Sequence, residues 1–459
     1  MIAVRKNSLK ALADKKLQAS LKKATMTALQ KRSAAIAGSE TYETSRDRAI
    51  AVRDASVSGL SLLLDQFSAA CRKLSIKVDI FDDYEGANAR ILEIIKAKGA
   101  DYIVKSKSML TEEMALNDHL GKNGVVPIET DLGEFIVQLA GEAPSHITSP
   151  ALHKSKQDVA ALFTEKLDMA STDDIQAMAE FARNHMREKF LNAKVGITGA
   201  NFAIAESGSI AIVENEGNAR MCLSMPETHI AVFGVEKLIP RLRDLPYFLD
   251  LLSKSATGQI SNAYTSVAGK PAAGHERHYI IVTHKRFEMA ADPVFKEALR
   301  CIRCGACQNV CPVFQRISGH GYGFTYGGPI GIMLAPFFKG YTECEEMINA
   351  STLCGFCSSI CPMKISIPHL IIEHRRRLAE EYDGRVSLAH GFKRLLSYAY
   401  RIAMSYYLVR KAVRPLTRMY LKLSRKALGY NYIPLWNKFA KRHFIDMPRK
   451  TFMEGHFKK

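Results

Sequence analysis

The placement of the cysteines constrains this chain more than any other feature. Ten cysteines occur in 459 residues, and eight of them lie within positions 301–361. Disulfide scaffolds are typical of small secreted domains, whereas a dense cysteine cluster in a long intracellular chain indicates bound metal. The first residues, Met1 to Lys6, lack the apolar stretch of a secretory signal, so we expect an intracellular protein. The cluster therefore predicts a metal centre.

The first cysteine motif has the spacing of a bacterial ferredoxin. It reads Cys301-Ile-Arg-Cys304-Gly-Ala-Cys307-Gln-Asn-Val-Cys311-Pro312. Three thiolates spaced by three residues can bind separate irons of one cubane, and the glycine between them permits a tight turn. In two-cluster ferredoxins the fourth cysteine, which precedes a proline, ligates the other cluster.

A second motif repeats this spacing, with Ser351 at its first position. It reads Ser351-Thr-Leu-Cys354-Gly-Phe-Cys357-Ser-Ser-Ile-Cys361-Pro362. The crossed scheme predicts two ligand sets for two [4Fe-4S] clusters. The first set is Cys301, Cys304, Cys307 and Cys361, and the second is Cys311, Cys354 and Cys357.

The fourth ligand of the second set is open between three alternatives. Ser351 could ligate through oxygen, Cys344 could reach in from upstream, or the cluster could lack one iron. We favour two cubanes with an unusual fourth ligand. Structural zinc is a poorer match, since it pairs two short cysteine knuckles. The isolated Cys71 and Cys222 are predicted to be small buried side chains.

Before the cysteines, apolar runs and helical patterns alternate, as in a mainly parallel α/β sheet. Strands are predicted at 77–81, 101–104, 125–129, 229–233 and 278–284, and helices at 88–98, 111–120 and 156–191. Two short apolar runs within 203–213 predict a hairpin entering this sheet. Further helices are predicted at 8–32 and 290–301.

These patterns divide the chain into four parts. We predict a basic N-terminal helical segment at 1–59, an α/β domain at 60–287, a helical two-cluster ferredoxin-type domain at 288–370, and a basic helical C-terminal extension at 371–459. The loop between the motifs contains a glycine-rich stretch, 319–331, which either approaches a cofactor or partner closely or is simply packed.

Positive charge is concentrated at the two ends of the chain. Residues 1–36 contain 9 Lys and Arg against 1 acidic residue, and residues 371–459 contain 21 against 6. The net charge of +18 therefore belongs to the ends and not to the body. The basic, tyrosine-containing tail predicts docking on partner subunits, with peripheral contact to an anionic membrane as the alternative. We expect no nucleic-acid binding, because no recognised module surrounds these residues.

The motifs together resemble the family of lactate-utilisation iron–sulfur proteins of the B type. The resemblance rests on both cysteine motifs and on five further stretches: 105–113, 130–135, 199–208, 214–220 and 255–259. It implies an α/β lactate-utilisation domain similar in fold to the sugar-isomerase and CoA-transferase group, followed by the dicluster domain. It also implies a non-catalytic electron carrier in a cytoplasmic three-subunit complex that oxidises L-lactate to pyruvate, associated with the membrane face if the tail binds lipid. The implied partners are a cysteine-rich subunit and a second lactate-utilisation-domain subunit.

The α/β domain carries a candidate anion site but no nucleotide motif. Gly199-Ala-Asn201 and Glu206-Ser-Gly208 are expected beside strand ends, where α/β sheets bind ligands. A polar group after the hairpin completes the predicted site, and its arginine could hold a carboxylate or phosphate: Glu214, Glu216, Asn218 and Arg220. A structural role for these turns is the alternative. The scattered histidines His119, His146 and His153 are expected to be structural. A redox or ligand-binding subunit for a different 2-hydroxy acid or electron donor is the second functional hypothesis.

Overall fold

A computed structural model describes residues 2–383 and several short segments beyond them, at 395, 398–399, 401–402, 405–406 and 415–424. Residues Met1–Leu378 form one compact unit, and Ala379–Lys459 belong to another. Most of the predicted basic extension, 371–459, therefore lies outside the described residues. Every helix in the described part is too short or too polar to span a membrane.

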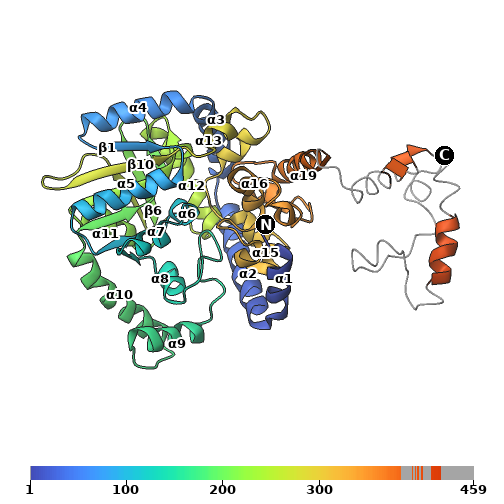
Figure 1. The fold of residues 1–459 in the computed structure, drawn as a ribbon, viewed down its shortest axis with the longest axis horizontal. Coiled ribbons are helices and arrows are strands. Elements are labelled where there is room, and N and C mark those ends of the chain that lie inside the picture. The colour runs from blue at the N-terminus through green and yellow to red at the C-terminus, as the bar shows by residue number, and fades with distance from the viewer. Residues whose placement is uncertain are drawn as a thin grey trace. The chain divides into compact units, whose positions relative to one another are not determined.

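The centre of the first unit is a sheet of six parallel strands (Figure 1). In spatial order they are β1 (Lys77–Phe81), β10 (Glu276–Val282), β7 (Thr228–Gly234), β4 (Val195–Thr198), β2 (Tyr102–Lys105) and β3 (Val126–Glu129). The predicted parallel α/β sheet is thus confirmed. Strand β4 was not predicted, because its apolar run is only four residues long and contains Gly196.

Helices cover both faces of this sheet. They are α4 (Leu60–Lys73), α5 (Tyr84–Ala97), α6 (Met109–Glu113), α7 (Leu116–Lys122), α8 (Leu132–Leu139), α9 (Lys156–Leu167), α10 (Ile175–Asn192), α11 (Asn218–Ser224) and α13 (Arg286–Ala291), with 3-10 turns η1 (Val235–Lys237) and η2 (Leu242–Asp244). Helix α12 (Leu245–Ala256) packs instead on α2 and α3. Alternate residues of β7 enter opposite cores: Ala231 and Phe233 pack towards α4, and Ile230 and Val232 pack towards α5 and α7. A run buried on both faces of a sheet is apolar, as residues 230–233 of β7 are, while the buried His229 at the start of the strand is hydrogen-bonded to Thr198 at 2.9 Å.

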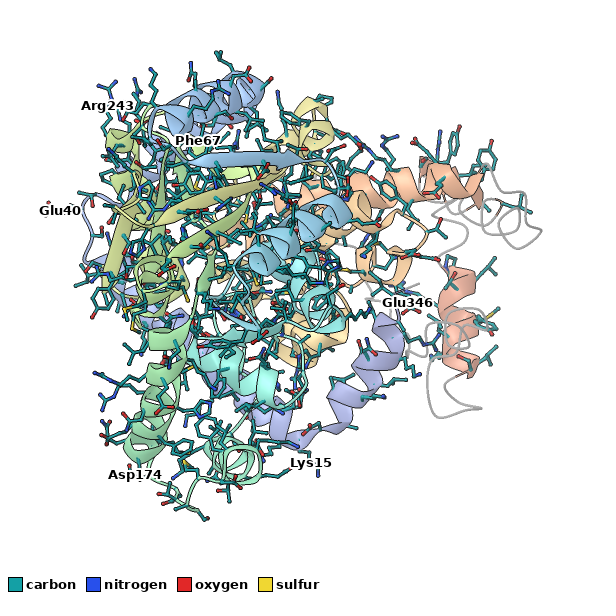
Figure 2. All side chains as sticks on the ribbon, turned by 60° about the vertical axis from the view of Figure 1, so that its left-hand side comes forward. Lys15, Glu40, Phe67, Asp174, Arg243 and Glu346 are labelled. Carbon is teal, nitrogen blue, oxygen red and sulfur yellow. The ribbon has the colours of Figure 1, made fainter. Side chains whose placement is uncertain are left out.

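The aromatic centre of the core on the α4 side is Phe67, labelled in Figure 2. Its ring lies 5.7 Å from the ring of Tyr279 on β10 and 5.9 Å from that of Phe233 on β7. These contacts attach α4 to two adjacent strands of the sheet, β10 and β7.

A second, four-stranded sheet stands beside the first. Its order is β8 (Leu238–Ile239), β5 (Phe202–Ile204), β6 (Ser209–Glu214) and β9 (Tyr264–Ala268). Strands β5 and β6 form the predicted hairpin, but the expectation that it enters the parallel sheet is wrong. The hairpin pairs with β8 and β9 instead, because Gly199–Asn201 turn the chain away directly after β4.

The remaining helices surround the cysteines. They are α1 (Val4–Ala13), α2 (Lys15–Ala37), α3 (Tyr42–Ser58), η3 (Phe295–Arg300), α14 (Ala306–Val310), α15 (Phe314–Tyr322), α16 (Gly328–Lys339), α17 (Glu345–Ile348), α18 (Phe356–Ile360) and α19 (Ile367–Asp383). Helices α1 and α2 pack on α14 and α15, although they are some 300 residues apart in the sequence (Figure 1). Glu346, labelled in Figure 2, accepts a hydrogen bond from the backbone amide of Arg5 at 2.8 Å.

Four helices that we predicted as continuous are interrupted. The helix at 156–191 breaks at Asp168, where φ is +56°, and forms α9 and α10. The helix at 8–32 breaks at Asp14, whose carboxylate caps α2 by accepting from the amide of Leu17 at 2.9 Å. The helix at 111–120 breaks at Ala115, where φ is +50°. The helix at 290–301 is replaced by α13 and η3, which are separated by Pro293, since proline disfavours helix for the preceding residue.

A close approach between β4 and α11 makes Gly196 a sensitive position. A β-carbon there would lie 2.0 Å from the carbonyl oxygen of Cys222. We predict that Gly196→Ala destabilises the fold by about 3 kcal/mol or more, measured as a fall in melting temperature. Gly121→Ala on α7 is the matched control: nothing lies within 4 Å of its β-carbon, so a small gain is expected. Equal melting temperatures for the two variants would contradict this packing.

Candidate metal centre

The two cysteine motifs follow the same backbone path. Each contains a glycine with positive φ, Gly305 at +75° and Gly355 at +87°, which begins a five-residue helix, α14 or α18. Two residues earlier, Arg303 and Leu353 also have positive φ, at +59° and +56°. Helices α14 and α18 lie in contact, so the two motifs face each other.

The four cysteines of the first predicted set line one small cavity. Cys301, Cys304 and Cys307 come from the first motif, and Cys361 comes from the end of the second. The rest of the wall is mainly apolar, and includes Ile302, Ile330, Met333, Ile365 and Ile367. This cavity, called the cluster cavity below, has a donor set of sulfurs alone, which suits iron–sulfur ligation.

The second predicted set lies next to the first. These three cysteines are close together, because negative charge on Cys354 raises the pKa of Cys311, and negative charge on Cys311 and Cys354 raises that of Cys357. Negative charge on Cys357 likewise raises the pKa of Cys307, which belongs to the first set. The two sets are therefore neighbours in the structure, as the crossed scheme requires.

Burial strongly disfavours thiolates at these positions in the absence of a cation. It raises the pKa of Cys304 and Cys357 to about 12 and that of Cys361 to about 11, and nearby cysteines add to the effect. Bound metal would supply the compensating positive charge. Across the described residues, no three Cys, His, Asp or Glu side chains are close enough to hold a single metal ion.

Ser351 has the place in the second motif that Cys301 has in the first. The Cys301 sulfur accepts from the amide of Arg303 at 3.4 Å, and the Ser351 hydroxyl accepts from the amide of Leu353 at 3.2 Å. Cys344 is different, because it is fully buried at the start of α17. The charged groups that shift the pKa of its thiol are Glu343, Lys339 and the amino terminus, and not the other cysteines.

Arginines from the N-terminal helices fasten the second motif from outside. Arg32 on α2 donates to the carbonyl of Ile360 at 2.8 Å. Arg46 on α3 donates to the carbonyls of Cys361 at 2.9 Å and of Pro362 at 3.2 Å. The segment predicted as a separate basic part, 1–59, is thus packed into the metal centre.

The glycine-rich stretch 319–331 is packed against backbone. A β-carbon on Gly319 would lie 2.2 Å from the carbonyl oxygen of Ser145, and one on Gly331 would lie 1.7 Å from that of Tyr326. The glycines therefore permit helix packing.

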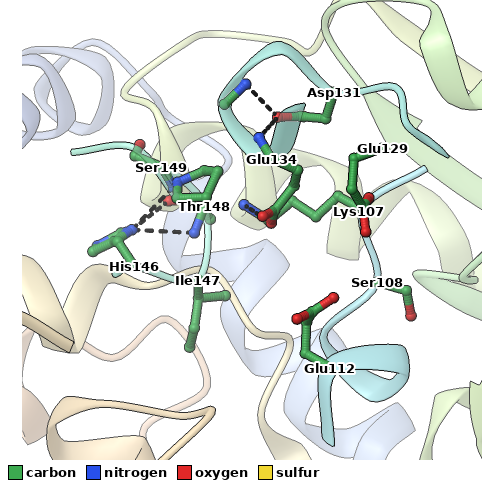
Figure 3. A network of polar contacts seen from close by, with 12 residues as sticks. Lys107, Ser108, Glu112, Glu129, Asp131, Glu134, His146, Ile147, Thr148 and Ser149 are labelled. Carbon is green, nitrogen blue, oxygen red and sulfur yellow. Dashed lines mark hydrogen bonds and ion pairs between the residues drawn. The ribbon is translucent and has the colours of Figure 1, made fainter. Parts of the chain in front are cut away.

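His146 is a buried structural residue, as expected, and its ring nitrogen accepts from the amides of Thr148 and Ser149 (Figure 3).

A second cavity of about 300 Å³ opens where β2, β4 and β7 end. We call it the strand-end cavity. It is lined by Asn201, Glu214, Glu216 and Asn218 from the predicted anion site, together with Lys107, Lys237, Arg303 and Tyr326. Arg220 does not line it, so our expectation that Arg220 would hold the anion is wrong. Its exposed guanidinium lies over the Tyr264 ring at 4.7 Å.

Buried charges lie beside this cavity, at the ends of β2 and β3. Lys105 is fully buried with Glu129 at 2.6 Å and Glu112 at 3.4 Å. Lys107 lies 3.3 Å from Glu134 (Figure 3). Burial raises the pKa of Glu134 to about 7; Lys107 opposes this rise, and the two other carboxylates add to it. Sequence reasoning missed this group, whose only local signal is the acidic residues within 105–113 and 130–135.

Comparison with known proteins now identifies the family. The model of the LUD domain matches residues 64–288, and that of the 4Fe-4S dicluster domain matches 297–365. A lactate utilization protein B of Exiguobacterium is 44% identical over 346 residues, which cover 74% of each chain. The chain belongs to the lactate utilization protein B family.

Other relatives of this chain have similar identities. A lactate utilization protein B of Bacillus cytotoxicus is 41% identical, over 76% of this chain and 74% of the relative. An Escherichia coli protein described as the uncharacterized electron transport protein YkgF is 42% identical, over 74% of this chain and 73% of the relative.

The turn at Gly305 offers a test of the first motif. A β-carbon there would lie 2.9 Å from the His146 ring, whereas nothing lies within 4 Å of the same position on Gly355. Both substitutions to alanine carry a left-handed backbone cost of about 1–2 kcal/mol. We predict that Gly305→Ala lowers bound iron and sulfide more than Gly355→Ala does. Equal contents in the two purified variants would show that the contact with His146 does not shape the motif.

The raised pKa of Glu134 predicts a pH-dependent gain in stability for Glu134→Gln. The folded chain holds the Glu134 proton more tightly than the unfolded chain, so stability falls as pH rises from about 4 to about 7 and stays lower above that. A neutral glutamine avoids this loss, which amounts to about 3 kcal/mol. The melting temperature of Glu134→Gln should exceed that of the wild type more at about pH 8 than at about pH 5. The exposed Glu165→Gln is the control, and a pH-independent difference for Glu134→Gln would contradict the assignment.

Proposed function

We propose that this chain is the iron–sulfur electron-transfer subunit of a multisubunit complex that oxidises L-lactate to pyruvate. Two [4Fe-4S] clusters would be held by Cys301, Cys304, Cys307 and Cys361, and by Cys311, Cys354 and Cys357. When bound, the clusters supply one-electron chemistry. The observation that carries the proposal is the cluster cavity, whose four cysteines come from both motifs. The dicluster-domain match and the names of the relatives support it.

The surroundings of the two sets support different roles for them. The first set is enclosed between the strand-end cavity and the apolar wall of the cluster cavity. In the second set Cys354 is exposed, and the neighbouring Phe356 is 58% exposed. An exposed aromatic side chain beside a redox site is suited to contact with a partner protein. We infer that electrons are exchanged with a partner at the second set.

The fourth ligand of the second cluster is proposed to be Ser351. Its hydroxyl makes the same turn contact as the sulfur of Cys301, which favours it over Cys344. A cluster that lacks one iron is the remaining alternative, since a hydroxyl is a weaker iron ligand than a thiolate.

The organisation of the complex extends the proposal. We propose the domain boundaries 1–59, 60–287, 288–370 and 371–459, and a sugar-isomerase/CoA-transferase-like fold for the α/β domain. The proposed partners are a cysteine-rich subunit and a second lactate-utilisation-domain subunit, in the cytoplasm. The basic tail would dock on them or on an anionic membrane face.

An alternative function shares the same clusters. The chain could serve a complex that oxidises a different 2-hydroxy acid or takes electrons from another donor. The Escherichia coli relative is described only as an electron transport protein, which is compatible with either function. Growth on L-lactate after deletion of the gene separates the two, because unimpaired growth would leave only the alternative.

The proposal predicts the metal content of the anaerobically purified chain. About eight irons and eight sulfides per chain, with interacting signals in the EPR spectrum of the reduced protein, are expected. Ser351→Ala should alter the signal of one cluster, and Cys344→Ala should leave both unchanged.

Other outcomes have distinct meanings. About seven irons, with a signal in the oxidised protein, would mean that the second cluster has three irons. A changed EPR signal in Cys344→Ala but not in Ser351→Ala would identify Cys344 as the fourth ligand. Zinc without sulfide would overturn the electron-transfer proposal.

A further inference from the structure

The strand-end cavity connects the α/β sheet with the first cysteine motif. One side is formed by residues that follow β2, β4 and β7, the edge at which parallel α/β sheets bind ligands. The opposite side includes Arg303, which stands between Cys301 and Cys304 in the chain. A molecule in this cavity would therefore lie beside the first proposed cluster.

The carboxylates on the cavity wall already have partners. Asp131 accepts from two amides at the start of α8, at 3.1 and 3.3 Å, and Glu216 accepts from the first amide of that helix at 3.0 Å. Glu214 accepts from two amides of α11 at 2.7 and 2.8 Å. Glu236 is paired with Arg286 at 2.8 Å. The hydrogen bonds and the ion pair of these carboxylates stabilise the wall of the cavity.

The cations on the same wall are less well satisfied. The Lys107 ammonium is buried without a hydrogen-bond partner, and its nearest carboxylate oxygen, on Glu134, is 3.3 Å away (Figure 3). One terminal nitrogen of Arg303 is buried without a partner, and the other is 3.7 Å from Glu236. In the described part of the chain, no hydrogen bond or ion pair holds the side chain of Lys237. Buried hydrogen-bond donors of a cation that stay unused are costly unless an anion accepts from them.

We propose that the strand-end cavity binds the carboxylate of a small organic acid through Lys107, Lys237 and Arg303. A guanidinium matches a planar carboxylate with two parallel hydrogen bonds, and the lysines add charge. Asn201, Asn218 and Ser108 line the same cavity and can bind a hydroxyl or keto group on the neighbouring carbon.

The acidic wall favours a monoanion over a phosphate. Glu214, Glu216 and Asp131 bring negative charge to the rim, which would repel a dianion more strongly than a single carboxylate. The cavity, at about 300 Å³, holds a small acid together with several waters of about 30 Å³ each. The choice of 2-hydroxy and 2-oxo acids as probes rests on the proposed function, whereas the anion site rests on the cavity.

Isothermal titration calorimetry of the anaerobically purified full chain tests this site. We expect L-lactate or pyruvate to bind to the wild type and inorganic phosphate to bind at least about tenfold more weakly. Lys237→Met and Lys107→Met should each weaken binding of the acid about tenfold or more, the cost of a lost charged hydrogen bond. The matched control is Arg220→Met, an exposed cation outside the cavity, which should bind like the wild type.

Three results would overturn the site. These are no heat with either acid, phosphate binding as tight as that of the acids, or unchanged affinity in both lysine variants that retain the wild-type melting temperature. Iron and sulfide assays on the same samples separate this proposal from the electron-transfer function. Full clusters without acid binding would remove only the cavity site, and acid binding without iron would remove only the carrier.

Discussion

The carboxylate of Glu236 is the interaction on which the arrangement of the molecule depends. It lies buried just beyond the end of β7, 2.8 Å from Arg286 and 3.7 Å from Arg303. Burial alone would raise its pKa, but Arg286, Lys237 and Arg303 outweigh burial and lower it to about 2. Arg286 continues the network to Glu113 at 2.7 Å, to which Tyr326 also donates a hydrogen bond at 2.8 Å. Removal of one member of such a group leaves an unpaired buried charge, which costs about 3–5 kcal/mol.

This network joins the α/β sheet to the cysteine-bearing region. Glu236 follows a strand of the sheet, whereas Arg303 belongs to the first cysteine motif and Tyr326 to the segment between the motifs. On the other side of the cysteines, Arg300 of η3 binds Asp54 of α3 through two hydrogen bonds of 2.5 and 2.9 Å. The metal centre is thus held from the sheet and from the N-terminal helices, which explains why residues 1–378 form one compact unit although the family models match two domains.

Much of the fold could be predicted from local pattern, and the interruptions could not. The apolar runs 230–233 of β7 and 279–282 of β10 are buried on both faces of the sheet, whereas β1 is an edge strand without a fully buried residue. Strand β4 is short and contains Gly196, so its pairing is visible only in the tertiary structure. The hairpin was predicted from its turn, but the sheet it joins depends on β8 and β9, which lie further along the chain.

The two candidate sites also differ in how much of each could be predicted from local sequence. Cysteine spacing suggests the two ligand sets because the motifs are local, and that assignment stays a prediction until metal is observed. The strand-end cavity draws Lys107, Lys237 and Arg303 from three distant segments, so sequence reasoning selected Arg220, which belongs to the same short stretch as Glu214 and Glu216.

The crossed ligand scheme is the central claim, and anomalous diffraction at the iron edge from crystals grown anaerobically tests it most directly. The account predicts two separate iron peaks. One should be surrounded by Cys301, Cys304, Cys307 and Cys361, and the other by Cys311, Cys354 and Cys357. A peak surrounded by Cys301, Cys304, Cys307 and Cys311, or a single peak shared between the motifs, would contradict it.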